Sequence, residues 1–192
     1  MLTVRAEQVP PQAWRNGGGH TRELLARPAG ADWTVRVSLA DIDAEGPFSA
    51  FPGVERWFAV VQGAGVVLRF SGSERALRVG DAPLRFDGAD APGCSLIDGS
   101  TRDLNLMLRG SVGAMQAVRS GEWWDEHFDE RGLFTRVAGR WQAGPMNAGG
   151  VPAWHRVEAQ TLLWDIGGAP CSFVPDGAGP CGWWLGFSEQ HA

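Results

Sequence analysis

Frequent glycine and proline are the feature that most limits the folds open to this chain. Its 192 residues include 27 glycines and 12 prolines, spread along the whole sequence. They separate apolar runs of about 5 to 8 residues, a spacing typical of β-sandwiches and β-barrels. Long helices are hard to place between them, because both residue types destabilise a helix interior. The sequence therefore predicts an all-β protein.

The clearest strand pattern runs from Trp33 to Leu39. Apolar side chains occupy every second position of this segment, and Thr34, Arg36 and Ser38 occupy the positions between them. Successive side chains of a strand point to opposite faces, so this alternation predicts a strand with one apolar and one polar face.

Shorter apolar runs follow this strand up to residue 110. The glycine-rich segment 62–65 can take the positive φ angles that a tight hairpin demands. We therefore expect a meander of short strands over residues 20–110. Its expected strands are 58–61, 66–70, 75–79, 84–86, 96–97 and 104–108.

The second half of the sequence is less regular. Segment 122–128 could form a short helix or an edge strand, and the pattern does not choose between them. Segments 161–166, 171–174 and 183–187 again predict strands separated by turn residues. A second β unit packed on the first is therefore expected.

Charge and composition exclude several classes of protein. The net charge is −5, lysine is absent and the arginines are scattered singly, so no basic surface for nucleic acid is expected. No apolar run approaches the roughly 20 residues of a membrane span, and the first residues do not form a signal peptide, so we expect a cytoplasmic protein without a membrane partner. Cys94, Cys171 and Cys181 have no CxxC spacing, and we interpret them as packing thiols.

Three expected strands carry a pair of polar residues opposite their apolar face. The simplest explanation of each pair is that the polar face of its strand is exposed to water. If the sheet curls into a barrel, however, the pairs converge on a lumen with room for one small ligand. There an arginine can bind a carboxylate through two hydrogen bonds. The pairs are Thr21 with Glu23, Arg36 with Ser38, and Asp103 with Asn105.

Four sequence blocks, in this order, resemble the signature of the HutD/Ves family. They are Trp14–Leu24, Arg36–Ile42, Gly46–Arg56 and Asp103–Met107. The resemblance implies a cupin-type double-stranded β-barrel, with a bicupin arrangement of two packed β units. Residues 1–110 would form the N-terminal barrel that carries the motifs, and residues 111–192 a second, smaller unit.

The resemblance also implies an association with histidine-utilisation enzymes. It implies a pocket for a pathway intermediate such as urocanate or formylglutamate, and a role in restraining that pathway.

Carried over by motif, the ligand-binding candidates are Asn16, Thr21, Glu23, Arg36, Ser38, Ser49, Phe51, Arg56, Asp103, Asn105 and Met107. Five of them also have a simpler explanation: Asn16 as a loop residue, Ser49 as a turn residue, Phe51 and Met107 as core, and Arg56 as an ion-pair partner.

Neither a metal site nor a nucleophile is expected. Metal-binding cupins hold their ion with closely spaced histidines and a glutamate, because those side chains point to one centre. Here His20, His127, His155 and His191 stand alone, without an HxH or ExxH pair. No GxSxG elbow and no phosphate-binding loop occur either, so the sequence predicts no cofactor.

Three classes of function remain open. The leading hypothesis is a non-catalytic, metal-free protein that sequesters or signals a small polar or carboxylate ligand. The alternative is a metal-independent isomerase, lyase or hydrolase that uses Glu23 or Asp103 as a buried acid–base group. The third is an assembly protein in which the pairs Trp123–Trp124 and Trp183–Trp184 each place one ring in the core and the other in a homodimer interface.

Overall fold

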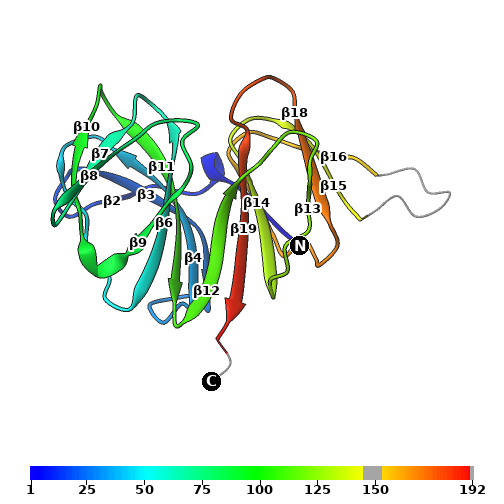
Figure 1. The fold of residues 1–192 in the computed structure, drawn as a ribbon, viewed down its shortest axis with the longest axis horizontal. Coiled ribbons are helices and arrows are strands. Elements are labelled where there is room, and N and C mark those ends of the chain that lie inside the picture. The colour runs from blue at the N-terminus through cyan, green and yellow to red at the C-terminus, as the bar shows by residue number, and fades with distance from the viewer. Residues whose placement is uncertain (145–152, 191–192) are drawn as a thin grey trace. The chain divides into compact units, whose positions relative to one another are not determined.

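The computed structural model describes residues 1–144 and 153–190, and its regular structure is almost entirely β (Figure 1). The all-β prediction is confirmed. Besides the strands, the described residues form two three-residue 3₁₀ helices, η1 (Ala6–Gln8) and η2 (Gly88–Asp90), and neither could cross a membrane. The strands are β1 (Leu2–Arg5), β2 (Gln12–Ala13), β3 (Gly19–Arg27), β4 (Val35–Ile42), β5 (Gly46–Pro47), β6 (Val54–Gln62), β7 (Val66–Phe70), β8 (Ser73–Leu77), β9 (Leu84–Asp87), β10 (Gly93–Leu96), β11 (Thr101–Arg109), β12 (Ser111–Ala117), β13 (Trp123–Trp124), β14 (Glu130–Thr135), β15 (Gly139–Ala143), β16 (His155–Val157), β17 (Thr161–Trp164), β18 (Cys171–Pro175) and β19 (Gly182–Glu189).

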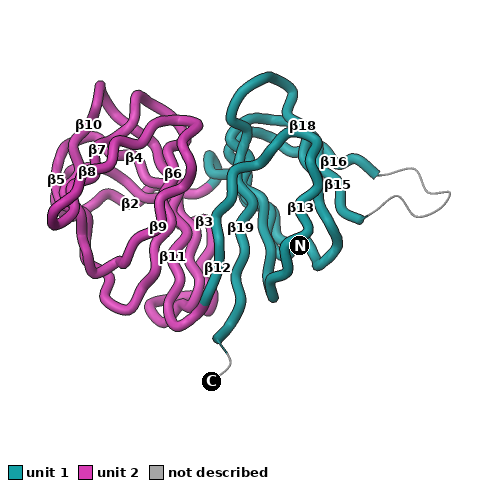
Figure 2. The backbone as a smooth tube through the Cα atoms, viewed as in Figure 1, with its two compact units in different colours: residues 1–8, 112–192 teal, residues 9–111 magenta. Residues whose placement is uncertain are grey.

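The chain divides into two compact units (Figure 2). One comprises residues 9–111, and the other comprises residues 1–8 together with 112–192. The expectation that the first unit begins at residue 1 is therefore wrong for the first eight residues. Strand β1 pairs antiparallel with β17, from Leu2 opposite Trp164 to Arg5 opposite Thr161, because that edge satisfies its backbone hydrogen-bonding groups.

The unit of residues 9–111 consists of two sheets. A six-stranded sheet has the order β2-β3-β4-β11-β6-β9, and a four-stranded sheet has the order β5-β10-β7-β8. Apolar side chains from both sheets form one core cluster, which includes Phe58 of β6 and Leu68 of β7. The meander prediction is wrong, because β11 lies between β4 and β6 and most consecutive strands belong to different sheets.

The turn at residues 62–65 shows how the chain changes sheet. Gly63 and Gly65 have φ angles of +96° and +104°, so glycine is needed here, as the sequence predicts. The turn does not close a hairpin, however. It carries the chain from β6 in one sheet to β7 in the other, and Thr101 Oγ1 hydrogen-bonds both the N–H and the carbonyl of Gly65, at 3.2 and 3.1 Å.

The other unit also contains two sheets, ordered β1-β17-β14-β19-β12 and β13-β18-β15-β16. The strands predicted near 161–166, 171–174 and 183–187 are confirmed as β17, β18 and β19. Within segment 122–128, the structure forms only the two-residue strand β13. A core cluster rich in aromatic side chains fills this unit, and Trp124 stacks on Trp184 with ring centroids 5.1 Å apart.

Only the first of the two tryptophan pairs follows the expected alternation. Trp123 is 45% exposed and Trp124 is buried, as a strand with one free face requires. Trp183 and Trp184 are both buried, so this second pair exposes no ring for a partner.

Replacing Gly65 by alanine tests the sheet-changing turn. A Cβ atom at Gly65 would lie 2.1 Å from the backbone oxygen of Leu77, in addition to the strain of a positive φ. We expect Gly65→Ala to lower the free energy of unfolding by about 3 kcal/mol or more, measured by urea denaturation. The control is Gly72→Ala, at φ +87° with nothing within 4 Å, which should cost only about 1–2 kcal/mol. Equal losses in the two variants would refute the steric argument.

Candidate functional site

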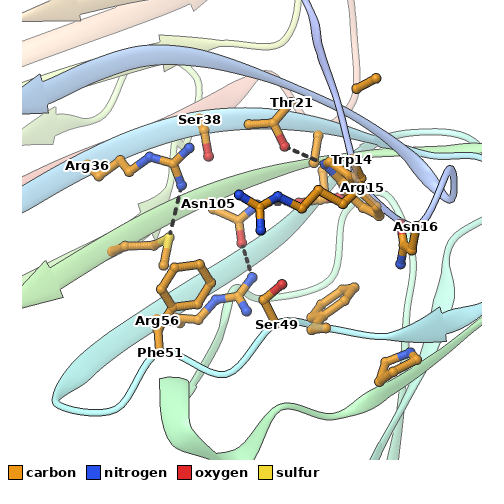
Figure 3. Close-up of a pocket in the computed structure, with 16 residues that line it drawn as sticks. Trp14, Arg15, Asn16, Thr21, Arg36, Ser38, Ser49, Phe51, Arg56 and Asn105 are labelled. Atoms are coloured by element: carbon orange, nitrogen blue, oxygen red, sulfur yellow. Dashed lines mark hydrogen bonds between the residues drawn. The ribbon is translucent and has the colours of Figure 1, made fainter. Parts of the chain in front are cut away.

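A cavity of about 440 Å³ lies within the unit of residues 9–111 (Figure 3). Its walls come from β2, β3, β4, β5, β6 and β11 and from the segments that follow β2 and β5. The lining residues are Ala13, Trp14, Arg15, Asn16, Thr21, Arg36, Ser38, Ala40, Pro47, Phe48, Ser49, Phe51, Arg56, Asp103, Asn105 and Met107.

The pairing of β11 with both of its neighbours gathers the polar side chains of the cavity. Asn105 lies opposite Ser38 of β4, and Met107 lies opposite both Arg36 of β4 and Arg56 of β6. Residues directly opposite each other in adjacent strands point to the same face of the sheet. Side chains from three strands therefore line one face, and the leucines between them at 104, 106 and 108 are buried on the other.

Ten of the eleven sequence-predicted site residues line this cavity, and Glu23 does not. Glu23 lies beside an irregularity in the pairing of β3 with β4, between Glu23 and Leu25. Its Oε2 atom accepts a hydrogen bond of 2.7 Å from Arg36 Nε. Glu23 therefore contributes to the site by holding an arginine rather than by forming the wall.

Sequence reasoning missed several lining residues, of which Arg15, Trp14 and Phe48 matter most. Figure 3 shows the Arg15 side chain extending from its loop into the cavity that Arg36 and Arg56 also line. Trp14 donates its indole N–H to Thr21 Oγ1 at 2.7 Å. Loop side chains follow no period, so only their position inside the first family block could have indicated them.

Arg56 is a buried cation in the cavity wall, with only 6% of its surface exposed. Its Nη2 donates to Asn105 Oδ1 at 2.8 Å, and its Nε has no hydrogen-bond partner. The guanidinium carbon lies 5.1 Å from the ring centroids of Phe48 and Phe86 and 5.7 Å from that of Phe51, close enough for cation–π attraction. Burial lowers the pKa of Arg56 to about 10, although Asp103 opposes the shift, so the group stays charged at neutral pH.

Asp103 is the carboxyl group among the lining residues, and it is 1% exposed. Its Oδ1 accepts a 2.5 Å hydrogen bond from Asn105 Nδ2, and its Oδ2 has no partner. Burial raises the pKa of Asp103 to about 8, against the opposing effects of Arg56 and the Asn105 hydrogen bond. At pH 7 the neutral acid therefore predominates.

The lining consequently has an excess of positive charge. Arg15, Arg36 and Arg56 contribute three guanidinium groups, whereas the one lining carboxyl is largely protonated at pH 7. Glu23, outside the lining, balances the charge of Arg36 alone. Guanidinium groups bind carboxylates through paired, charge-assisted hydrogen bonds. The arrangement is suited to a small anion.

The described histidines and cysteines lie outside this cavity lining. Within residues 1–144 and 153–190, no three His, Cys, Asp or Glu side chains gather as a metal site would require. His20 Nδ1 lies 3.3 Å from Asp43 Oδ2, the His155 ring lies beside Trp141, and His191 falls outside the described residues. All three cysteines are buried free thiols, and burial raises the pKa of Cys94 to about 12.

Comparison with known proteins finds relatives that are named for HutD, the hutC region or Ves. The family model HutD matches residues 6–174. An uncharacterized 21.2 kDa protein in the hutC 3' region of Pseudomonas putida is 38% identical over 128 residues, which span 64% of this chain and 63% of that protein. Protein Ves of Citrobacter koseri is 31% identical over 183 residues, which span 88% of this chain and 95% of Ves.

Solved structures show the same fold. The structure of HutD from Pseudomonas fluorescens SBW25, obtained in a formate condition, superposes with a TM-score of 0.81 at 26% identity and covers 99% of both chains. A variant of oxalate decarboxylase from Bacillus subtilis superposes with a TM-score of 0.60 at 9% identity, covering 100% of this chain and 78% of that one. The second likeness concerns the fold alone, which is cupin-like.

Replacing Asp103 by asparagine tests the neutral acid. A carboxyl group whose pKa is about 8 when folded and about 3.9 when unfolded stabilises the protein at low pH, and this contribution is lost as the pH rises toward 8. Between pH 5 and 8, we expect wild-type stability to fall relative to Asp103→Asn by up to about 1.4 kcal/mol per pH unit, measured by urea denaturation.

The control for this comparison is Asp98→Asn, which removes an exposed carboxyl of the same unit. This variant should keep the pH dependence of the wild type. Parallel stability curves for the wild type and Asp103→Asn would show that Asp103 is ionised throughout the range.

Proposed function

The chain belongs to the HutD family and has a cupin-like fold, and from this premise we propose that it is a cytoplasmic, metal-free protein that binds a small carboxylate in the cavity of residues 9–111. Its role would be regulatory, through sequestering or signalling that ligand. Small-ligand sites generally have volumes of about 300–1,000 Å³, and the cavity falls in this range.

One observation carries the proposal: three arginines meet at a cavity whose single lining carboxyl is largely neutral at pH 7. Arg56 would hold its charge at the wall, and Arg15 and Arg36 would offer donors to the ligand. Of the three, Arg56 is buried without an ion pair among the described residues, whereas Arg36 is paired with Glu23 and Arg15 is exposed. Burying a cation without counter-charge is costly, and an anionic ligand would offset that cost for Arg56. The lining also contains the neutral donors Ser38 and Ser49, which could orient such a ligand.

The comparisons suggest where such a ligand would come from. The Pseudomonas putida relative is described by its place in the hutC 3' region, and the Pseudomonas fluorescens protein is named HutD. We therefore propose an intermediate of histidine degradation, urocanate or formylglutamate. The lining offers no histidine or cysteine, and this donor set supports binding without a metal ion.

The unpartnered Oδ2 of Asp103 favours a second candidate function. A carboxyl group whose pKa is about 8 can act as a general acid or base near neutral pH. A metal-independent isomerase, lyase or hydrolase could use it in the same cavity. Glu23 does not line the cavity, so a pair of carboxyls sharing a proton does not support this alternative.

A thermal-stability screen tests the binding function. We propose to heat the protein with histidine, urocanate, formylglutamate, glutamate or formate in turn. At a hundred times its dissociation constant, a ligand adds about 2.7 kcal/mol to the free energy of unfolding. We expect Arg15→Ala and Arg36→Ala to weaken binding of the active acid by about 10- to 100-fold, since each removes charged hydrogen-bond donors.

Arg75→Ala is the matched control, because Arg75 is an exposed arginine of β8 outside the lining. It should leave the stabilisation by the acid unchanged. If no acid of the panel raises the melting temperature, the binding function is rejected. If chromatography shows that the acid is consumed, and Asp103→Asn stops its consumption, the protein is an enzyme that uses Asp103.

A further inference from the structure

A hydrogen-bonded chain of three side chains runs through the wall of the cavity. Arg56 Nη2 donates to Asn105 Oδ1 at 2.8 Å, and Asn105 Nδ2 donates to Asp103 Oδ1 at 2.5 Å. A guanidinium group can only donate, so the amide oxygen of Asn105 must face Arg56 and its NH₂ group must face Asp103. Both hydrogen bonds therefore point from Arg56 toward Asp103, and Asp103 Oδ1 is an acceptor.

This direction places the proton of Asp103 on its other oxygen. Oδ1 accepts from Asn105, and Oδ2 has no hydrogen-bond partner in the described structure. The described ion pairs include none to Asp103, and the described side-chain hydrogen bond of Arg56 goes to Asn105. A buried carboxylate in this setting is costly, whereas a neutral carboxyl group with one unused donor is much less so.

Charged and titratable groups surround Asp103 on several elements. Arg56 of β6 favours ionisation of Asp103, and the carboxylate of Asp41, on β4, opposes it. Arg15 and Arg36 share the cavity lining, and the Cys94 thiol of β10, whose pKa burial raises to about 12, stays neutral below pH 9. Of these groups, Asp103 is the one expected to titrate between pH 7 and 9.

We propose that Asp103 determines the specificity of the cavity for anions by donating a hydrogen bond from its protonated Oδ2 to the ligand, so that binding retains one proton on this side chain. This inference rests on the proposed carboxylate-binding function. A carboxylate would then accept hydrogen bonds from the arginines and from Asp103 together. Once Asp103 is ionised, it repels the anion and offers no donor.

The affinity for acids should therefore depend on pH. We expect isothermal titration calorimetry to show that formate and urocanate bind the wild type about tenfold more weakly at pH 9 than at pH 7, because the donor form is depleted about tenfold. The range stops at pH 9, since Arg56, whose pKa is about 10, begins to lose its charge above it.

Asp103→Asn is the matched variant for this experiment. Its amide oxygen can still accept from Asn105, and its NH₂ group replaces the Oδ2 donor but has no proton to lose in this range. We expect the affinity of this variant for both acids to be the same at pH 9 as at pH 7.

A second measurement uses the wild type alone, so it does not depend on the folding of a variant. At pH 8 about half of the free protein carries the Asp103 proton, and the complex carries it fully. Titrations in buffers of different ionisation enthalpy should therefore show uptake of about half a proton per bound acid.

The possible results separate this inference from the function on which it rests. If neither acid binds at pH 7, the proposed function fails and this inference falls with it. Binding whose affinity is constant from pH 7 to 9, without proton uptake, would overturn the role of Asp103 alone. An equal loss of affinity in the wild type and Asp103→Asn would also overturn it, because another group would then be titrating.

Discussion

The antiparallel pairing of β11 with β4 on one side and β6 on the other is the constraint on which the site depends. Because side chains alternate along a strand, β11 divides its residues strictly between two faces. Leu104, Leu106 and Leu108 are fully buried on one face, and Asp103, Asn105 and Met107 line the cavity on the other. A shift of one residue in this register would exchange the two sets and abolish the cavity lining and the apolar face together.

The buried polar groups of this face are compatible with folding because only one of them has to carry charge. Arg56 keeps its positive charge among three phenyl rings and one amide oxygen. A carboxylate at Asp103 would add a second buried charge without a direct ion pair, and the raised pKa avoids this at pH 7. The same balance that permits burial leaves a neutral acid and a cation in the lining of the same small cavity.

The sequence predicts those parts of the site that follow a strand period. Arg36 with Ser38 and Asp103 with Asn105 are recognisable because each pair alternates with large apolar residues. Arg15 belongs to a loop and shows no such alternation, so no strand period indicates that its side chain reaches the cavity. Strand pairing between distant segments is equally hidden: nothing in residues 62–65 indicates whether their turn closes a hairpin or changes sheets, and nothing local to β1 indicates that it pairs with β17.

The two units show why the cavity chemistry belongs to residues 9–111. In the other unit, the buried Arg131 donates to the backbone oxygens of Gly167, Ala169 and Trp124, and its guanidinium lies over the Trp124 ring. Its two Nη groups are thereby used to hold loops around an aromatic core. Arg56 has one side-chain partner instead, and that partner leads to Asp103. The same residue type, buried in the same kind of two-sheet unit, holds loops where backbone oxygens accept from it and lines a cavity where a side-chain amide does.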